Sequence, residues 1–340
     1  MRRSTATLAR SQVLLADLTF PHSHVHIQRT RLPFIHLENV LHYAKIDRDG
    51  QVDGYIAVYL PDELTVLFLN GGVLVNAVAY TPGGRSVVPI APALRHIKKE
   101  RERGELMYCA ASNQQLAWMF RSCSQPATRR FVDQQQPEQL IPALSHEVFS
   151  GVLELISASK VNYLRFEDGE FVTGEFSHKP DEMPATEYVE SLFAPGSDGA
   201  PTQVAAAVFT HTETIPEQAP PELIQTFREL FWSITSACDA ETSGMATKQA
   251  IKYRDLLSKI HPALAAIGQP LDRDSVDVGM VATPQQLTSA LAEWTMQFLE
   301  QVEILAPGSA PAVLKKATRE QRFVLQKTGY YDGLPWTVRW

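Results

Sequence analysis

The sequence predicts an α+β protein, in which two similar small antiparallel-sheet-plus-helix modules are followed by an all-α helical bundle. Three observations predict this class: a segment that repeats, an alternation of apolar residues inside the repeat, and a change to helical spacing near residue 213. The expected domains are 1–125, which includes an N-terminal extension, 126–212 and 213–340. A chain of 340 residues exceeds the size at which a single core stops growing, so more than one core is expected.

The repeat aligns residues 54–80 with residues 151–177 without a gap, at an offset of 97. In both copies, apolar residues alternate in three short runs, as Ile56 and Val58 do in the first. A period of two indicates strands with one buried face. The identical pairs are Gly54/Gly151, Leu67/Leu164, Gly72/Gly169 and Val75/Val172.

Polar segments separate the runs in both copies. LPDE and SASK follow the first runs, and Gly71-Gly72 and Asp168-Gly169 follow the second. Asp-Gly and Gly-Gly supply the positive φ angles that tight hairpin turns require. Each copy is therefore expected to form a three-stranded antiparallel meander.

The flanking segments extend the repeat to about 90 residues with the order helix, three strands, helix, strand. Helices are the local candidates to cover the apolar face of each sheet. The helices are expected at 34–45, 91–103, 138–149 and 185–193, and the last strands at 105–111 and 202–209.

A segment rich in Pro, Thr and Glu from residue 212 indicates a linker. Beyond it, apolar residues recur at spacings of three and four, and Thr283 is a suitable helix cap before Pro284. The closing segment, with two Tyr and two Trp, is expected to dock on the bundle. The helices are predicted at 221–238, 246–267, 284–305 and 310–327.

The pattern of the meander, with Gly, alternating apolar residues, a polar-Gly turn and a further strand ending near Ala77 or Gly174, resembles a bacterial domain of uncharacterised function. That domain occurs at the N-terminus of PatA-type response regulators. The resemblance covers about 34–120 and, less well, 138–209. It implies a regulatory or scaffolding role in bacterial signalling, and it transfers no active site.

Composition narrows the function further. Net charge of −7 argues against bulk attraction of nucleic acid, and no apolar stretch approaches the roughly 20 residues of a membrane helix. The N-terminus lacks the apolar core and cleavage site of a signal peptide, so a cytoplasmic protein is expected. The chain has an odd number of cysteines, which is poorly suited to a disulfide framework. Cys109, Cys123 and Cys238 are therefore expected to stay reduced.

Three groups of residues are candidate sites. His22, His24 and His26 would share one face of a strand, a spacing that can bind zinc, although exposed or hydrogen-bonded histidines are the simpler interpretation. A basic run suits phosphate or nucleotide binding, and a solvated helix face is the competing interpretation. Its ligand candidates are Arg95, Lys98, Lys99 and Arg101.

Trp336 and Trp340, at the C-terminal end, are candidate interface residues, whereas Trp232 and Trp294 are expected in the core.

No nucleophile, phosphate-loop or dinucleotide motif is present, so no catalytic residue and no cofactor are predicted. The leading hypothesis is a non-enzymatic signalling adaptor that binds a protein partner and could form a homo-oligomer. The alternatives are a sensor of a small ligand, a nucleotide for example, with a site between the modules, and a metal-dependent hydrolase.

Overall fold

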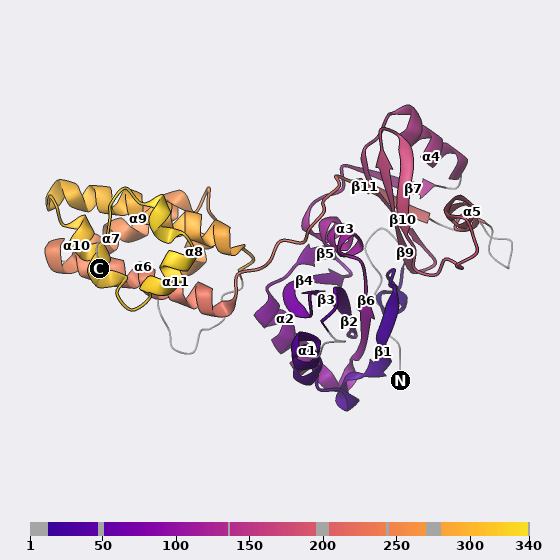
Figure 1. Ribbon diagram of the computed structural model, residues 1–340, viewed down its shortest axis with the longest axis horizontal. Coiled ribbons are helices and arrows are strands. Elements are labelled where there is room, and N and C mark those ends of the chain that lie inside the picture. Colours follow the sequence, from indigo (N-terminus) through magenta and orange to yellow (C-terminus); the bar gives the residue numbers. More distant parts are fainter. Residues whose placement is uncertain are drawn as a thin grey trace. The chain divides into compact units, whose positions relative to one another are not determined.

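The computed structural model describes residues 13–46, 51–134, 137–194, 204–242, 245–269 and 280–338. Two compact units make up the chain, Met1–Pro216 and Glu217–Trp340. The first contains all the described strands and the second is helical, which confirms the predicted fold class (Figure 1).

The first sheet is antiparallel throughout and has the strand order β1-β6-β2-β3-β4-β5. Its meander is β2-β3-β4, as predicted, and β6 pairs with β2 on the other side. The strands are β1 (His24–Arg31), β2 (Gly54–Tyr59), β3 (Leu64–Asn70), β4 (Val73–Thr81), β5 (Gly84–Val87) and β6 (Glu105–Ala110). The helices of this module are α1 (Leu37–Ile46), α2 (Ile90–Lys99) and α3 (Asn113–Ser124), with short 3-10 turns η2 (Leu32–Phe34) and η3 (Arg101–Arg103).

The second sheet has the order β10-β9-β8-β11-β7 and is also antiparallel. Its strands are β7 (Arg129–Gln134), β8 (Gly151–Ser157), β9 (Lys160–Glu167), β10 (Glu170–Glu175) and β11 (Val204–Phe209). Its helices are α4 (Pro137–His146) and α5 (Ala185–Ser191).

The two sheets share one topology. In each module the first strand pairs with the last, the last pairs with the first strand of the meander, and the meander continues outward. The predicted turns contain the expected left-handed residues, since φ is 53° and 77° at Gly71 and Gly72 and 49° and 83° at Asp168 and Gly169. The first module differs by the extra edge strand β5 and by α3. The edge strands β1 and β7 occupy equivalent positions and extend the repeat, and the sequence did not predict this correspondence.

Gly72 and Gly169, which occupy equivalent positions in the two modules, are required to be glycine for the same structural reason. A Cβ atom added to Gly72 would lie 1.7 Å from the carbonyl oxygen of Ala44, at the end of α1. The same addition to Gly169 would place the Cβ 2.6 Å from the carbonyl oxygen of Ser145, at the end of α4. In both modules the turn after the second meander strand therefore packs against the carboxyl end of the first helix.

Strand alternation sorts the apolar residues onto two faces of each sheet. Ile56 and Val58 of β2 face the first module's helices, as Leu153 and Leu155 of β8 face those of the second. These outer faces are covered by α1 and α2 in the first module and by α4 and α5 in the second. Both strands are buried on both faces, because the inner faces pack into one core shared by the two modules.

The shared core joins the modules. It contains inner-face residues of both sheets, the apolar side of α3, and an N-terminal stretch that includes Leu18 and Phe20. That stretch is tied to both sheets: the hydroxyl of Tyr59 donates to the carbonyl of Leu18 at 2.9 Å, and the amide of Val161 donates to the carbonyl of Thr19 at 2.9 Å. The two modules thus form one unit around a common interior.

One ion pair is buried within the region where the modules meet. Arg85 of β5 donates two hydrogen bonds to the carboxylate of Glu154 on β8, at 2.7 and 2.6 Å. Only 10% of the Arg85 side chain and 2% of the Glu154 side chain are exposed. Burial acts to lower the pKa of Arg85, but the Glu154 carboxylate and its hydrogen bonds outweigh it, so the pKa lies well above its ordinary value.

The second unit is an assembly of helices around a core that contains Phe227, Phe231, Trp294 and Phe298. The helix cap predicted at Thr283 is present, and Thr283 forms a capping box with Gln286. Two expected helices are each interrupted: residues 246–267 break before Pro262, and residues 310–327 break after Ala317. The helices are α6 (Pro221–Thr242), α7 (Ala246–Leu257), α8 (Ala263–Ile267), α9 (Pro284–Leu305), α10 (Ala310–Ala317) and α11 (Arg322–Lys327), with the 3-10 turn η4 (Tyr330–Gly333).

The closing segment docks on this unit as expected. Tyr330 is fully buried, and its hydroxyl lies 2.8 Å from the hydroxyl of Thr295. All three cysteines carry free thiols, and all three are buried, including Cys238, for which burial was not predicted. None of the helices in the described part of the chain combines the length and the apolar character that crossing a bilayer requires.

Candidate functional site

Each module has a cleft between its first and second helices, and the sheet contributes to the lining only in the second module. The cleft of the first module lies between α1 and α2, and that of the second lies between α4 and α5. Leu41 and Ile141 line the two clefts, and each directly follows a buried residue of its helix. The repeat therefore presents one type of surface hollow twice, with different side chains around it.

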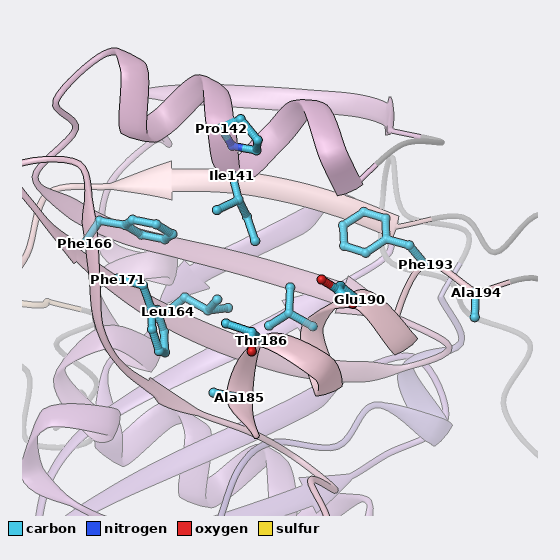
Figure 2. A pocket seen from close by; sticks show the side chains of 11 residues that line it. Ile141, Pro142, Leu164, Phe166, Phe171, Ala185, Thr186, Glu190, Phe193 and Ala194 are labelled. Carbon is cyan, nitrogen blue, oxygen red and sulfur yellow. The ribbon is translucent and has the colours of Figure 1, made fainter. Parts of the chain in front are cut away.

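The larger hollow, called here the second-module pocket, has a volume of about 600 Å³. Its floor is formed by buried side chains of the sheet and α5, among them Leu164, Phe166 and Val189. Figure 2 shows Ile141 extending from α4 toward these residues, with Phe171 and Phe193 at opposite ends. Its size falls within the range of about 300–1,000 Å³ that is usual for pockets that bind small molecules.

One acidic side chain lines the rim of this pocket, and others follow or precede its lining residues in the sequence. Glu190 of α5 lines it together with the hydroxyl of Thr186, and both residues are exposed. The β9–β10 turn, which precedes the lining residue Phe171, carries the exposed Glu167, Asp168 and Glu170. An apolar interior with a polar rim is the usual anatomy of a protein-binding surface.

The smaller hollow, called here the first-module cleft, has a volume of about 240 Å³ and a basic rim. Three of the four predicted ligand residues, Arg95, Lys98 and Arg101, line it around an apolar floor. Lys99 is exposed on the same helix but does not line the cleft. The structure thus brings most of the predicted basic group to one place.

The basic side chains of the first-module cleft have local partners. The Lys98 ammonium lies 3.9 Å from the Glu38 carboxylate, and both side chains are mostly exposed. Arg101 donates a hydrogen bond of 3.1 Å to the carbonyl of Pro33.

The ligand site was expected both between the modules and near the basic helix. The structure separates these places, because the region between the modules is a packed core and the basic cleft is on the opposite face of the first sheet.

The predicted metal ligands lie at the start of β1. The rings of His24 and His26 are 5.0 Å apart, and His26 also packs against Tyr108. Burial, and then the neighbouring His24, lower the pKa of His26. His22 places Nδ1 3.1 Å from the carbonyl oxygen of Phe20. Among the residues that the structure describes, no group of three His, Cys, Asp or Glu side chains is placed to hold a metal ion.

The aromatic residues of the C-terminal unit divide as follows. Trp294 is fully buried and stacks on Phe231 and Phe298. Trp232 and Trp336 are partly buried against the same core. Trp340 lies outside the described residues, so the interface prediction for Trp336 and Trp340 stays a prediction.

The chain matches no protein-family model, no curated protein and no solved structure. Sequence reasoning missed the second-module pocket, since its lining comes from α4, β9, β10 and α5, and each of these segments alone looks like ordinary core. The acidic residues that surround Phe171 in EDGEF were the available signal.

Proposed function

We propose that the chain is a non-enzymatic scaffolding adaptor that acts through protein–protein interaction, with the second-module pocket as its docking surface. The observation that carries the proposal is the pocket itself: an apolar hollow of about 600 Å³ whose lining includes three phenylalanines and Glu190. Interfaces are anchored where one side chain enters a well-packed pocket that excludes water. A role in bacterial signalling rests on the resemblance of the meander to the PatA-type domain.

The way the pocket is built supports a docking role. Its floor belongs to a sheet that is also packed on its inner face, so the pocket is held by a rigid support. A preformed surface loses less conformational freedom on binding, which favours affinity. The partner is expected to present an apolar side chain flanked by cationic groups, because Glu190 lines the pocket and the exposed acids of the β9–β10 turn precede the lining residue Phe171.

A capture experiment tests this proposal. The purified full-length chain is immobilised and exposed to a lysate of the source cell, in parallel with the Thr186→Trp variant, whose indole would fill the pocket. Ser191→Trp serves as the control, because Ser191 is exposed on the same helix and does not line the pocket. Calorimetry with the purified partner then measures the affinity.

The proposal predicts a partner that the wild type and Ser191→Trp retain equally and that Thr186→Trp loses. Partners retained equally by all three proteins would contradict it. Far-UV circular dichroism of the variants separates a filled pocket from an unfolded module.

A second candidate function, sensing of an anionic small ligand, is favoured by the first-module cleft. Arg95, Lys98 and Arg101 converge on a cleft of about 240 Å³, a size that suits a phosphate group and leaves the rest of a nucleotide outside. Clustered cations supply most of the affinity for phosphate. The cleft would then report the ligand through α2, which also covers the first sheet.

Thermal denaturation with inorganic phosphate and with nucleotides tests this alternative. A ligand that binds only the folded protein raises its melting temperature. The increase should be lost in Lys98→Ala and retained in Lys99→Ala, which removes a similar charge outside the cleft. No increase with any of these anions, or an increase that both variants retain, would exclude the alternative.

A further inference from the structure

Phe34 is the most exposed large apolar side chain in the part of the chain that the structure describes, at 75%. It ends η2, the short turn that links β1 to α1. The turn is anchored beneath it, because Leu32 is 2% exposed and its amide donates to the carbonyl of Gly104 at 2.9 Å. A phenyl ring is therefore displayed on a fixed support.

The residues around Phe34 hold the turn in place. The amide of Ile35 donates to the carbonyl of Leu32 at 3.0 Å, and Arg101 donates to the carbonyl of Pro33. The guanidinium of Arg31 lies 5.8 Å from the centre of the Phe34 ring. An aromatic side chain on such a turn would lose little additional freedom on binding, which is the property of an interface anchor.

The second-module pocket has the complementary form. Phe166, Phe171 and Phe193 line it and would surround an inserted ring, and aromatic rings favour tilted or edge-to-face contacts of this kind (Figure 2). A volume of about 600 Å³ exceeds one phenyl ring, so the flanking parts of η2 can enter as well. In the structure the pocket is not filled by the chain's own Phe34, which is exposed.

The charged residues around Phe34 and those around the second-module pocket are of opposite sign. The ring of Phe34 stands beside a basic group made of Arg31 and the cations of the first-module cleft. Glu190 of α5 lines the pocket, and further exposed acids lie next in sequence to its lining residues Phe171 and Thr186. Opposite potentials on two surfaces accelerate their encounter and fix their orientation. The basic group is Arg31, Arg95, Lys98 and Arg101, which outnumber the one acid of the cleft, Glu38, and the acidic group is Glu167, Asp168, Glu170, Glu187 and Glu190.

We propose that Phe34 of one copy inserts into the second-module pocket of a second copy, so that the chain self-associates. The inference rests on the proposed docking function of the pocket and names its occupant. Donor and acceptor surfaces lie on different modules, so the contact is heterologous and can join copies head to tail. Self-association of this kind would display many copies of the C-terminal unit together, which suits a scaffold.

Sedimentation velocity over a range of concentrations tests the inference with two variants. Phe34→Ser removes the inserted ring but keeps the pocket, and Thr186→Trp fills the pocket but keeps the ring. Each variant alone should be monomeric, whereas a 1:1 mixture should form a heterodimer, since one partner supplies the pocket and the other the ring. The control, Phe323→Ser, removes an equally exposed ring (69%) from the other unit and should associate like the wild type.

The expected loss for Phe34→Ser is at least about 30-fold in the association constant, the usual effect of removing an aromatic anchor. Raising the salt concentration should weaken the wild-type association, because the rims are charged. A wild type that is still monomeric at about 1 mM would overturn the inference, since that concentration detects even weak contacts. A mixture that stays monomeric, or a Phe34→Ser variant that associates normally, would overturn it too.

Failure of this inference is distinguishable from failure of the adaptor function. If the wild type is monomeric but Thr186→Trp still loses a captured partner, the pocket docks another protein and only the self-association is wrong. If Thr186→Trp changes neither self-association nor capture, both proposals are wrong.

Discussion

Removing one partner of the buried Arg85–Glu154 pair should destabilise the first unit strongly. In Glu154→Leu, the guanidinium of Arg85 would keep its charge at a site where only 10% of its side chain is exposed, and both hydrogen bonds to Glu154 would be lost. Leaving a charge buried without its partner costs about 3–5 kcal/mol. The same pair replaced by apolar residues, in Arg85→Met/Glu154→Leu, should be close to the wild type, because no charge is then left in the core.

Hydrogen–deuterium exchange with peptide resolution is the appropriate assay, because it reports the opening of β5 and β8 separately from the C-terminal unit. The control is Glu167→Gln, which breaks the pair Arg165–Glu167, where 60% of the Glu167 side chain is exposed. That substitution should cost less than about 1 kcal/mol. A small effect of Glu154→Leu, or a double variant as unstable as the single one, would refute the view that each charge is tolerated in the core because the other compensates it.

Three further predictions follow from local geometry. Gly72→Ala should lower the melting temperature, because its Cβ would meet the end of α1, whereas Gly71→Ala, with nothing within 4 Å, should show only the strain of its positive φ. Tyr330→Phe should lower the free energy of unfolding by about 1–3 kcal/mol by leaving the buried hydroxyl of Thr295 without its partner, and denaturant unfolding measures this loss. The pKa of His26 is lowered from 6.5, so the unfolded state binds more protons below about that pH and stability falls as pH decreases; His26→Gln should reduce this fall in pH-dependent unfolding.

The repeat could be predicted because its signals are local. Gly72 and Gly169 had to be glycine for their φ angles and for the close approach of a helix end, and the alternating residues had to face a core. The helical unit was predictable for the same reason, since Thr283 and the spacing of apolar residues act within single helices.

Features formed by residues that are far apart in the sequence could not be predicted from local patterns. The pairing of β1 with β6 contains two register irregularities. Strand β1 also carries adjacent exposed residues, Gln28 and Arg29, so its sequence does not alternate regularly between apolar and polar residues. The helix α3 lies between two sheets whose inner faces have no individual signature. The basic residues of the first-module cleft were predicted because they are neighbours in the sequence, and the pocket was missed because its residues are not.

The most direct test of the account replaces Phe34 with a photoactivatable phenylalanine analogue and mixes heavy-isotope and light copies of the chain before irradiation. The proposed assembly predicts cross-links that join heavy to light chains, from position 34 to the peptides that contain Phe171 and Phe193. Cross-links confined to single chains, or directed to other surfaces of the second copy, would contradict it.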